Sequence, residues 1–82
     1  MNGFENIANI VRFHRKKSGL SQSALANMAG VGKTAVFDIE KGKQSVQLDT
    51  ITKVFSVLNI RMEFVSPLMD ELRSSKNETE KL

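Results

Sequence analysis

Apolar residues recur at helical spacing in four segments of the chain, over about residues 5–18, 22–29, 33–41 and 48–58. The first segment shows the i, i+3, i+4, i+7 spacing that marks one helical face, at Ile7, Ile10, Val11 and His14. Ser21 stands where it can cap the second helix, and Gly30 stands where that helix should stop. The second and third helices are short and are separated only by Gly30-Val31-Gly32, an arrangement typical of a helix-turn-helix.

The pattern changes period after the fourth helix. Residues 60–65 alternate apolar and polar positions, which predicts a strand with Ile60, Met62 and Phe64 on one face. No other segment reads as a strand, and a lone strand leaves its backbone groups unpaired. We therefore expect the same strand of a second copy to pair with it across a dimer; the alternative is a stretch of irregular chain.

The last part of the chain predicts little structure. Ser66 followed by Pro67 is typical of a helix start, so a short helix is expected over about 67–73. From Ser74 onward the chain has too few apolar residues to fold, which predicts a disordered tail. We thus divide the chain into residues 1–66, one domain ending in the dimerisation strand, and residues 67–82, a short helix and tail.

Composition excludes several classes of function. The 82 residues contain no Cys and one His, so disulfides, thiol catalysis and a His- or Cys-based metal site are not expected. No constellation of catalytic side chains is identifiable, so we expect neither an enzyme nor a cofactor. No apolar run could span a membrane and the first residues lack signal-peptide features, so a cytoplasmic protein is expected.

The positive charge is concentrated. The whole chain has a net charge of +3, yet residues 12–43 hold seven Lys or Arg and only two Asp or Glu. Such a patch suits a polyanionic partner, although it is equally compatible with a solvated surface. Within it, Gly32-Lys33-Thr34 ends like a phosphate-binding loop, but Asn27 stands where that motif needs Gly and no strand precedes it.

Residues 21–42 carry a specific resemblance. At fixed spacing, nine positions fit the pattern of the Cro and phage-repressor-like (XRE-type) helix-turn-helix family: Gln22, Leu25, Ala26, Gly30, Val31, Val36, Ile39, Glu40 and Gly42. The resemblance implies an all-α, lambda-repressor-like domain of four to five helices that binds double-stranded DNA and represses transcription. It also implies that Arg15 forms a structural ion pair with Glu40.

The family assigns the DNA contacts by position. The resemblance implies that base edges face Lys33, Thr34, Phe37 and Asp38 on the third helix. Asp38 could instead hold Lys41 or Lys33 in place. By the same reasoning, the phosphate contacts fall to Ser21, Gln22, Lys43, Gln44 and Ser45.

Residues 48–64 resemble the HipB-type antitoxin branch of this family. That likeness implies a homodimer on a palindromic operator, with a HipA-like kinase toxin as partner. A stand-alone phage or restriction-modification regulator remains open. So does a protein-interaction module that no longer reads DNA, with Ile10 and Phe13 as part of its partner surface.

Overall fold

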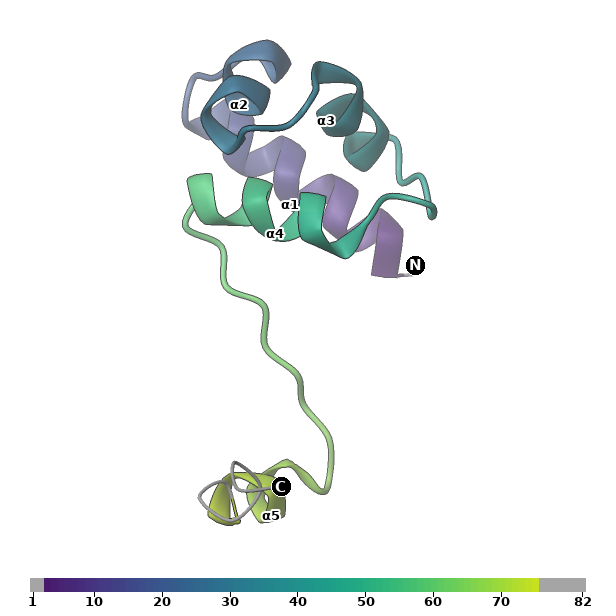
Figure 1. Ribbon diagram of the computed structural model, residues 1–82, viewed down its shortest axis with the longest axis vertical. Helices are drawn as coiled ribbons and strands as arrows, with labels where there is room; N and C mark the ends of the chain where they lie inside the picture. Colours follow the sequence, from purple (N-terminus) through teal and green to yellow (C-terminus); the bar gives the residue numbers. More distant parts are fainter. Residues whose placement is uncertain (1–2, 76–82) are drawn as a thin grey trace.

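Five α-helices make up the regular structure of residues 3–75, the part of the chain that the computed structural model describes. They are α1 (Gly3–Lys17), α2 (Gln22–Ala29), α3 (Lys33–Glu40), α4 (Leu48–Val57) and α5 (Met69–Ser74). Helices α1–α4 pack together as a body, and an extended arm, residues 59–68, leads away from it to α5 (Figure 1). The fold is therefore all-α, as the sequence predicts.

Capping residues fix the ends of α2, as expected. The Ser21 hydroxyl oxygen accepts a hydrogen bond from the Ala24 N–H at 3.0 Å. At the other end, Gly30 adopts the left-handed conformation with φ 71°, which glycine reaches at no steric cost. This sharp stop sends the chain directly into α3.

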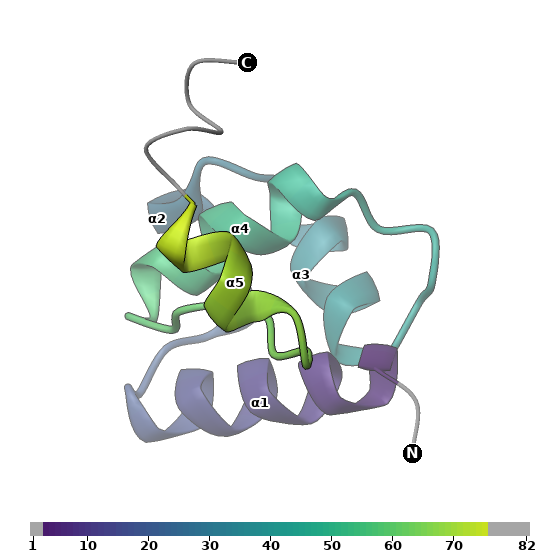
Figure 2. The same ribbon diagram turned by 90° about the horizontal axis from the view of Figure 1, so that it is seen from below.

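The core lies where α1, α2, α3 and α4 meet (Figure 2). One apolar side chain from each helix is completely buried there: Val11, Leu25, Val36 and Val54. Ala26 is also buried, and its small side chain lets α2 approach its neighbours closely. The body thus fixes the orientation of α3 through contacts on its inner face.

The strand predicted over residues 60–65 is absent from the single chain. This segment is extended but forms no ladder, because the rest of the chain between residues 3 and 75 folds into helices and loops and supplies no second strand. Ile60 and Met62 pack partly against the core, whereas Phe64 is 64% exposed. The apolar face of residues 60–65 therefore contacts the body only in its first half.

The C-terminal helix begins later than predicted. Its N-cap is Leu68, not Ser66, and the Ser66 carbonyl instead accepts a hydrogen bond from the Met69 N–H at 3.2 Å. That backbone bond closes a turn before the helix starts. Ser74, predicted to begin the tail, is the last residue of α5, and the tail after residue 75 lies outside the described residues.

Candidate nucleic-acid interface

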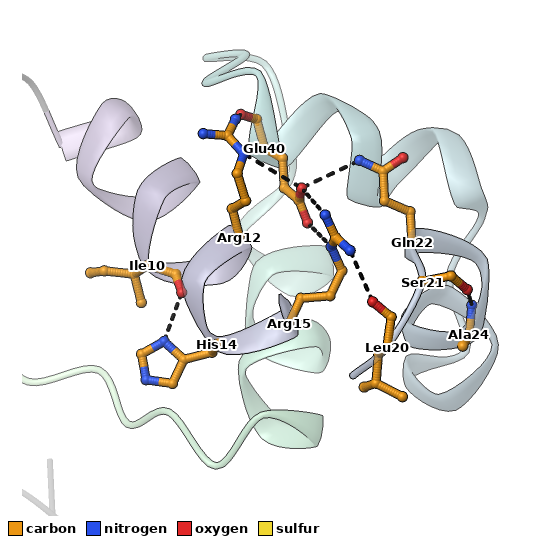
Figure 3. A network of polar contacts seen from close by, with 9 residues as sticks. All are labelled: Ile10, Arg12, His14, Arg15, Leu20, Ser21, Gln22, Ala24 and Glu40. Atoms are coloured by element: carbon orange, nitrogen blue, oxygen red, sulfur yellow. Dashed lines mark hydrogen bonds and ion pairs between the residues drawn. The ribbon is translucent and has the colours of Figure 1, made fainter. Parts of the chain in front are cut away.

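A buried carboxylate joins the last turn of α3 to α1. Glu40 is only 4% exposed, and both of its oxygens accept hydrogen bonds from Arg15, at 2.6 Å from Nε and 2.9 Å from Nη2 (Figure 3). Arg15 also donates to the Leu20 carbonyl oxygen at 2.9 Å. The structure thus contains the Arg15–Glu40 ion pair that the family resemblance implied, in the two-pronged geometry that suits a guanidinium.

Two further side chains complete this network. Arg12 donates to the Glu40 backbone carbonyl oxygen and lies 3.8 Å from its carboxylate. The Gln22 amide donates to Glu40 Oε1 at 3.3 Å (Figure 3). One carboxylate therefore holds the ends of α1, α2 and α3 together.

The charge state of this network is well defined. Burial raises the pKa of Glu40, but the hydrogen bonds from Arg15 and Gln22 and the charges of Arg15 and Arg12 outweigh it, so the pKa lies below its ordinary value. The hydrogen bond to Glu40 likewise raises the pKa of Arg15. Both groups are therefore ionised at neutral pH.

The opposite face of α3 points to solvent. Lys33 and Thr34, in its first turn, are exposed, and Phe37 is 46% exposed, which is unusual for a large aromatic ring. The Lys41 ammonium lies 5.1 Å from the centre of the Phe37 ring, within range of a cation–π interaction. This face combines an amine, a hydroxyl and an aromatic ring on one rigid helix.

Asp38 is tied to the loop that follows α3. Its carboxylate lies 3.6 Å from the Lys43 ammonium, and its carbonyl oxygen accepts a hydrogen bond from the Lys43 N–H at 3.0 Å. Gly42 permits this turn with φ 79°. In this structure Asp38 therefore pairs with Lys43, not with Lys41 or Lys33.

The other predicted contact residues surround α3. Ser21 and Gln22 lie at the start of α2, but the first caps the helix and the second contacts Glu40. Gln44 and Ser45 are exposed in the loop after α3. Helices α2 and α3 lie at the end of the body opposite the arm (Figure 1).

Sequence reasoning missed three features of this site. Arg12 as a second cation on Glu40, Lys41 above Phe37, and Gln22 as a donor to Glu40 all depend on how separate elements meet. Only the Lys41–Phe37 pair had a local signal, since residues four apart share a helical face.

The described residues form neither a cluster of metal ligands nor a membrane-spanning helix. Among residues 3–75, no three His, Asp or Glu side chains come together in a way that could hold a metal ion. In the same range, no helix is both long and apolar enough to cross a bilayer.

Comparison with known proteins assigns the family. Residues 11–65 match the Helix-turn-helix family. The chain is also 34% identical over 62 residues to an uncharacterized HTH-type transcriptional regulator, y4mF, of Sinorhizobium fredii, which covers 76% of this chain and 82% of that protein. The chain therefore belongs to the helix-turn-helix family.

Solved structures show the same fold. A chain from a HipA-HipB-O2-O3 complex superposes with a TM-score of 0.72 at 22% identity, covering 82% of this chain and 94% of that one. A chain from a complex of a HipB variant with an O2 20mer gives a TM-score of 0.72 at 21% identity, covering 82% and 93%.

Proposed function

We propose that this member of the helix-turn-helix family is a transcriptional repressor that binds a palindromic operator in double-stranded DNA as a homodimer. The observation that carries the proposal is the outer face of α3, where Lys33, Thr34 and Phe37 are exposed on a helix fixed from behind by Glu40. A rigid, exposed helix of this kind can enter the major groove. The likeness to an HTH-type transcriptional regulator and to chains from a HipA-HipB-O2-O3 complex and a HipB-O2 20mer complex supports it.

Three side chains would read bases. Lys33 can donate to guanine O6 and N7, Thr34 can offer its methyl group or hydroxyl, and the exposed Phe37 ring can contact a thymine methyl group. Asp38 can accept from cytosine N4, but its contact with Lys43 makes a positioning role the better proposal. A carboxylate that faced phosphates alone would repel the DNA.

Phosphate contacts would flank the recognition helix. Lys43, Gln44 and Ser45 lie exposed or nearly so in the loop on one side, with Ser21 and Gln22 on the other. The Gln22 amide uses one N–H on Glu40, so its second N–H remains to donate to a phosphate. These contacts would give most of the affinity and make it depend on salt.

The proposed dimer would form through the arm. Pairing of residues 60–65 with the same residues of a second copy would satisfy backbone groups that the single chain leaves without a ladder. Two copies would place two recognition helices about one turn of DNA apart, roughly 34 Å. We assign Ile60, Met62 and Phe64 to this interface.

We further propose that the protein is the antitoxin of a HipBA-like pair, with a HipA-like kinase as partner. The fold shared with a chain of a HipA-HipB complex supports this assignment. A stand-alone regulator is the alternative. Co-expression with a kinase-like neighbouring gene should yield a stable complex and relieve growth arrest; failure of both favours the stand-alone regulator.

Sequencing the DNA that the purified protein retains from genomic fragments tests the main proposal. We expect enrichment of a palindrome and a mobility shift with that duplex that weakens steeply with salt. Equal recovery of all fragments, or no shift in dilute buffer, would overturn it.

Two lysine variants separate the roles of the contacts. Lys43→Ala should weaken binding to all duplexes about equally, whereas Lys33→Ala should relax preference at one position, by roughly 1–3 kcal/mol. A Lys33→Ala protein that keeps its full sequence preference would refute the base-reading role.

Phe37 can be tested from the DNA side. Replacing each operator thymine by uracil removes only a methyl group, so one position per half-site should lose affinity with wild-type protein. The Phe37→Ala variant should not respond to that replacement. If both proteins lose affinity equally, another residue contacts that methyl group.

A further inference from the structure

The arm and α5 expose an unusual amount of apolar surface. Four large apolar side chains within nine residues are half or more exposed: Phe64, Val65, Leu68 and Leu72. Figure 1 shows α5 well away from the body, and none of its residues is buried. A contiguous run of this kind marks an interaction surface.

The body carries a hollow that no side chain of the described chain fills. It has a volume of about 520 Å³ and lies where the arm leaves α4, lined by Thr52, Phe55 and Ser56 of α4 and by residues 59–62 at the start of the arm, Arg61 included. We call it the α4 groove. Four of its lining residues, 59–62, also begin the arm, so a segment that pairs with the arm must pass this groove.

We propose that two arms pair antiparallel about Met62, and that each arm thereby lays Leu68 and Leu72 on the α4 groove of the other copy. This rests on the proposed dimer, and it adds the register and a second interface. The occupant of the groove is thus a second copy of this chain.

Symmetry and charge favour an axis at Met62 over an axis at Arg61 or Glu63. The two-fold axis of such a pair runs perpendicular to the ribbon, so residues directly opposite each other share a face. The axis passes midway between the two copies of one residue, which we name as the residue at the axis. An axis at Arg61 or Glu63 sets two like charges opposite each other, which is destabilising. An axis at Met62 instead sets Arg61 opposite Glu63 of the other copy, twice.

The same register matches the apolar face. With the axis at Met62, Ile60 of each copy lies opposite Phe64 of the other, so a half-buried residue meets an exposed one. Arg61 and Glu63 are already 4.0 Å apart within one chain and are both exposed, so they lie on the other face and can exchange partners. Both faces of the ribbon are then complementary.

The register also fixes where α5 arrives. Opposite residues of the ladder have numbers that add up to 124, and the ladder ends where Phe64 of one copy lies opposite Ile60 of the other, because Asn59 has φ 58° and α4 ends at Val57. Beyond the ladder, residues 65–68 continue past the last turn of α4 of the other copy, where Ser56 lines the α4 groove, so we place Leu68 against that turn. Seen from below, the arm starts at the end of α4 (Figure 2).

Single cysteines test the register, because the chain contains none of its own. Met62→Cys should oxidise to a covalent dimer, since residues at the axis are about 4.5–5.5 Å apart between Cα atoms, within disulfide range. Glu63→Cys is the matched control and should not. Efficient cross-linking through residue 63 instead, or through neither, would overturn the proposal.

Reversed charges give an independent test. Arg61→Glu and Glu63→Arg should each weaken the homodimer by roughly tenfold or more, measured by sedimentation. An equimolar mixture should form a heterodimer of near wild-type affinity, because both cross-strand pairs are then restored. If Arg61→Glu dimerises normally, the axis does not lie at Met62.

A third pair of variants tests the α4 groove. Mixed Ser56→Cys and Leu68→Cys proteins should give a covalent heterodimer, whereas Ser23→Cys on α2 should not link to Leu68→Cys. A monomeric disulfide in the Ser56→Cys/Leu68→Cys double variant would show that the arm folds back instead. No 56–68 link alongside an efficient Met62→Cys dimer would also overturn the groove contact.

The outcome is separable from the proposed function. Duplex binding by the wild-type chain tests DNA recognition without reference to the arm register. Loss of both cross-links with duplex binding intact would refute only the present inference.

Discussion

Removing the cation from the buried Glu40 network should unfold this protein more readily than any surface change. The substitution Arg15→Met keeps an apolar stem of similar length. It leaves the Glu40 carboxylate, in a residue that is 4% exposed, without the two hydrogen bonds that Arg15 donates to it. A carboxylate that loses its partner inside a protein retains the full cost of its burial. Arg12 and Gln22 remain beside it and offset part of that cost.

The magnitude follows from this environment. Breaking a buried ion pair costs about 3–5 kcal/mol, and because Arg12 and Gln22 remain, we expect about 3 kcal/mol. A chain of this size has a total stability of roughly 4–12 kcal/mol. The loss should lower the Tm by roughly 12–24 °C.

Urea denaturation followed by circular dichroism, at one fixed protein concentration, measures the effect. The control is Arg15→Met/Glu40→Gln, which removes both charges together. Because the buried anion is then gone, the double variant should be no less stable than Arg15→Met, although Glu40→Gln alone also destabilises. Free-energy losses that add within about 0.5 kcal/mol would show that the pair is not coupled and refute the reasoning.

The same pair predicts an acid limb of the stability curve. Since the pKa of Glu40 is lower in the folded than in the unfolded chain, its stabilisation is complete above its ordinary pKa of about 4.5 and is lost as the pH falls below it. The difference in stability between the wild type and Glu40→Gln should therefore shrink below pH 4.5. A difference that stays constant down to pH 3 would contradict the lowered pKa.

Five further variants test the scaffold and the arm. Ser21→Ala removes the cap of α2 and should cost about 1 kcal/mol in urea denaturation. Gly30→Ala should cost about 1–2 kcal/mol because φ is 71° there, whereas Gly30→Asn should cost less. Leu25→Ala in the core should cost about 2–5 kcal/mol, seen as a lower Tm. Phe64→Asp should leave the helical circular dichroism of the body unchanged and give a monomer in sedimentation. Its affinity for a palindrome should fall by about 10²–10⁴, whereas its affinity for a single half-site should not change.

Local signals were sufficient to predict most of the fold. Helical periodicity, the Ser21 cap and the Gly30 stop placed α2 at the residues where the structure has it, and the other helices of the body within about two residues. Residues 60–65 were predicted less well, because a strand depends on a partner that a single chain does not supply. Ser66 failed as a cap because its backbone carbonyl closes a turn first.

The candidate site was only partly predictable. The position of each residue in the motif predicted that Arg15 pairs with Glu40 and that Lys33 is exposed, because both depend on how α3 packs. The pairing of Asp38 with Lys43 follows from the turn at Gly42, whose exact course depends on tertiary contacts. An exposed side chain can contact any of several nearby groups, so its partner cannot be predicted from the spacing of residues in the sequence.

The two faces of α3 explain why fold and sequence preference can be specified separately. Val36, Ile39 and Glu40 face inward, where each is at most 4% exposed and any change alters packing or charge burial. Lys33 and Thr34 face outward and touch little of the protein, so the core places no demand on their identity. Under the proposed function, a substitution on the outer face would therefore change which bases α3 contacts at little cost in stability. A substitution on the inner face would change stability first, and DNA affinity only through the position of the helix.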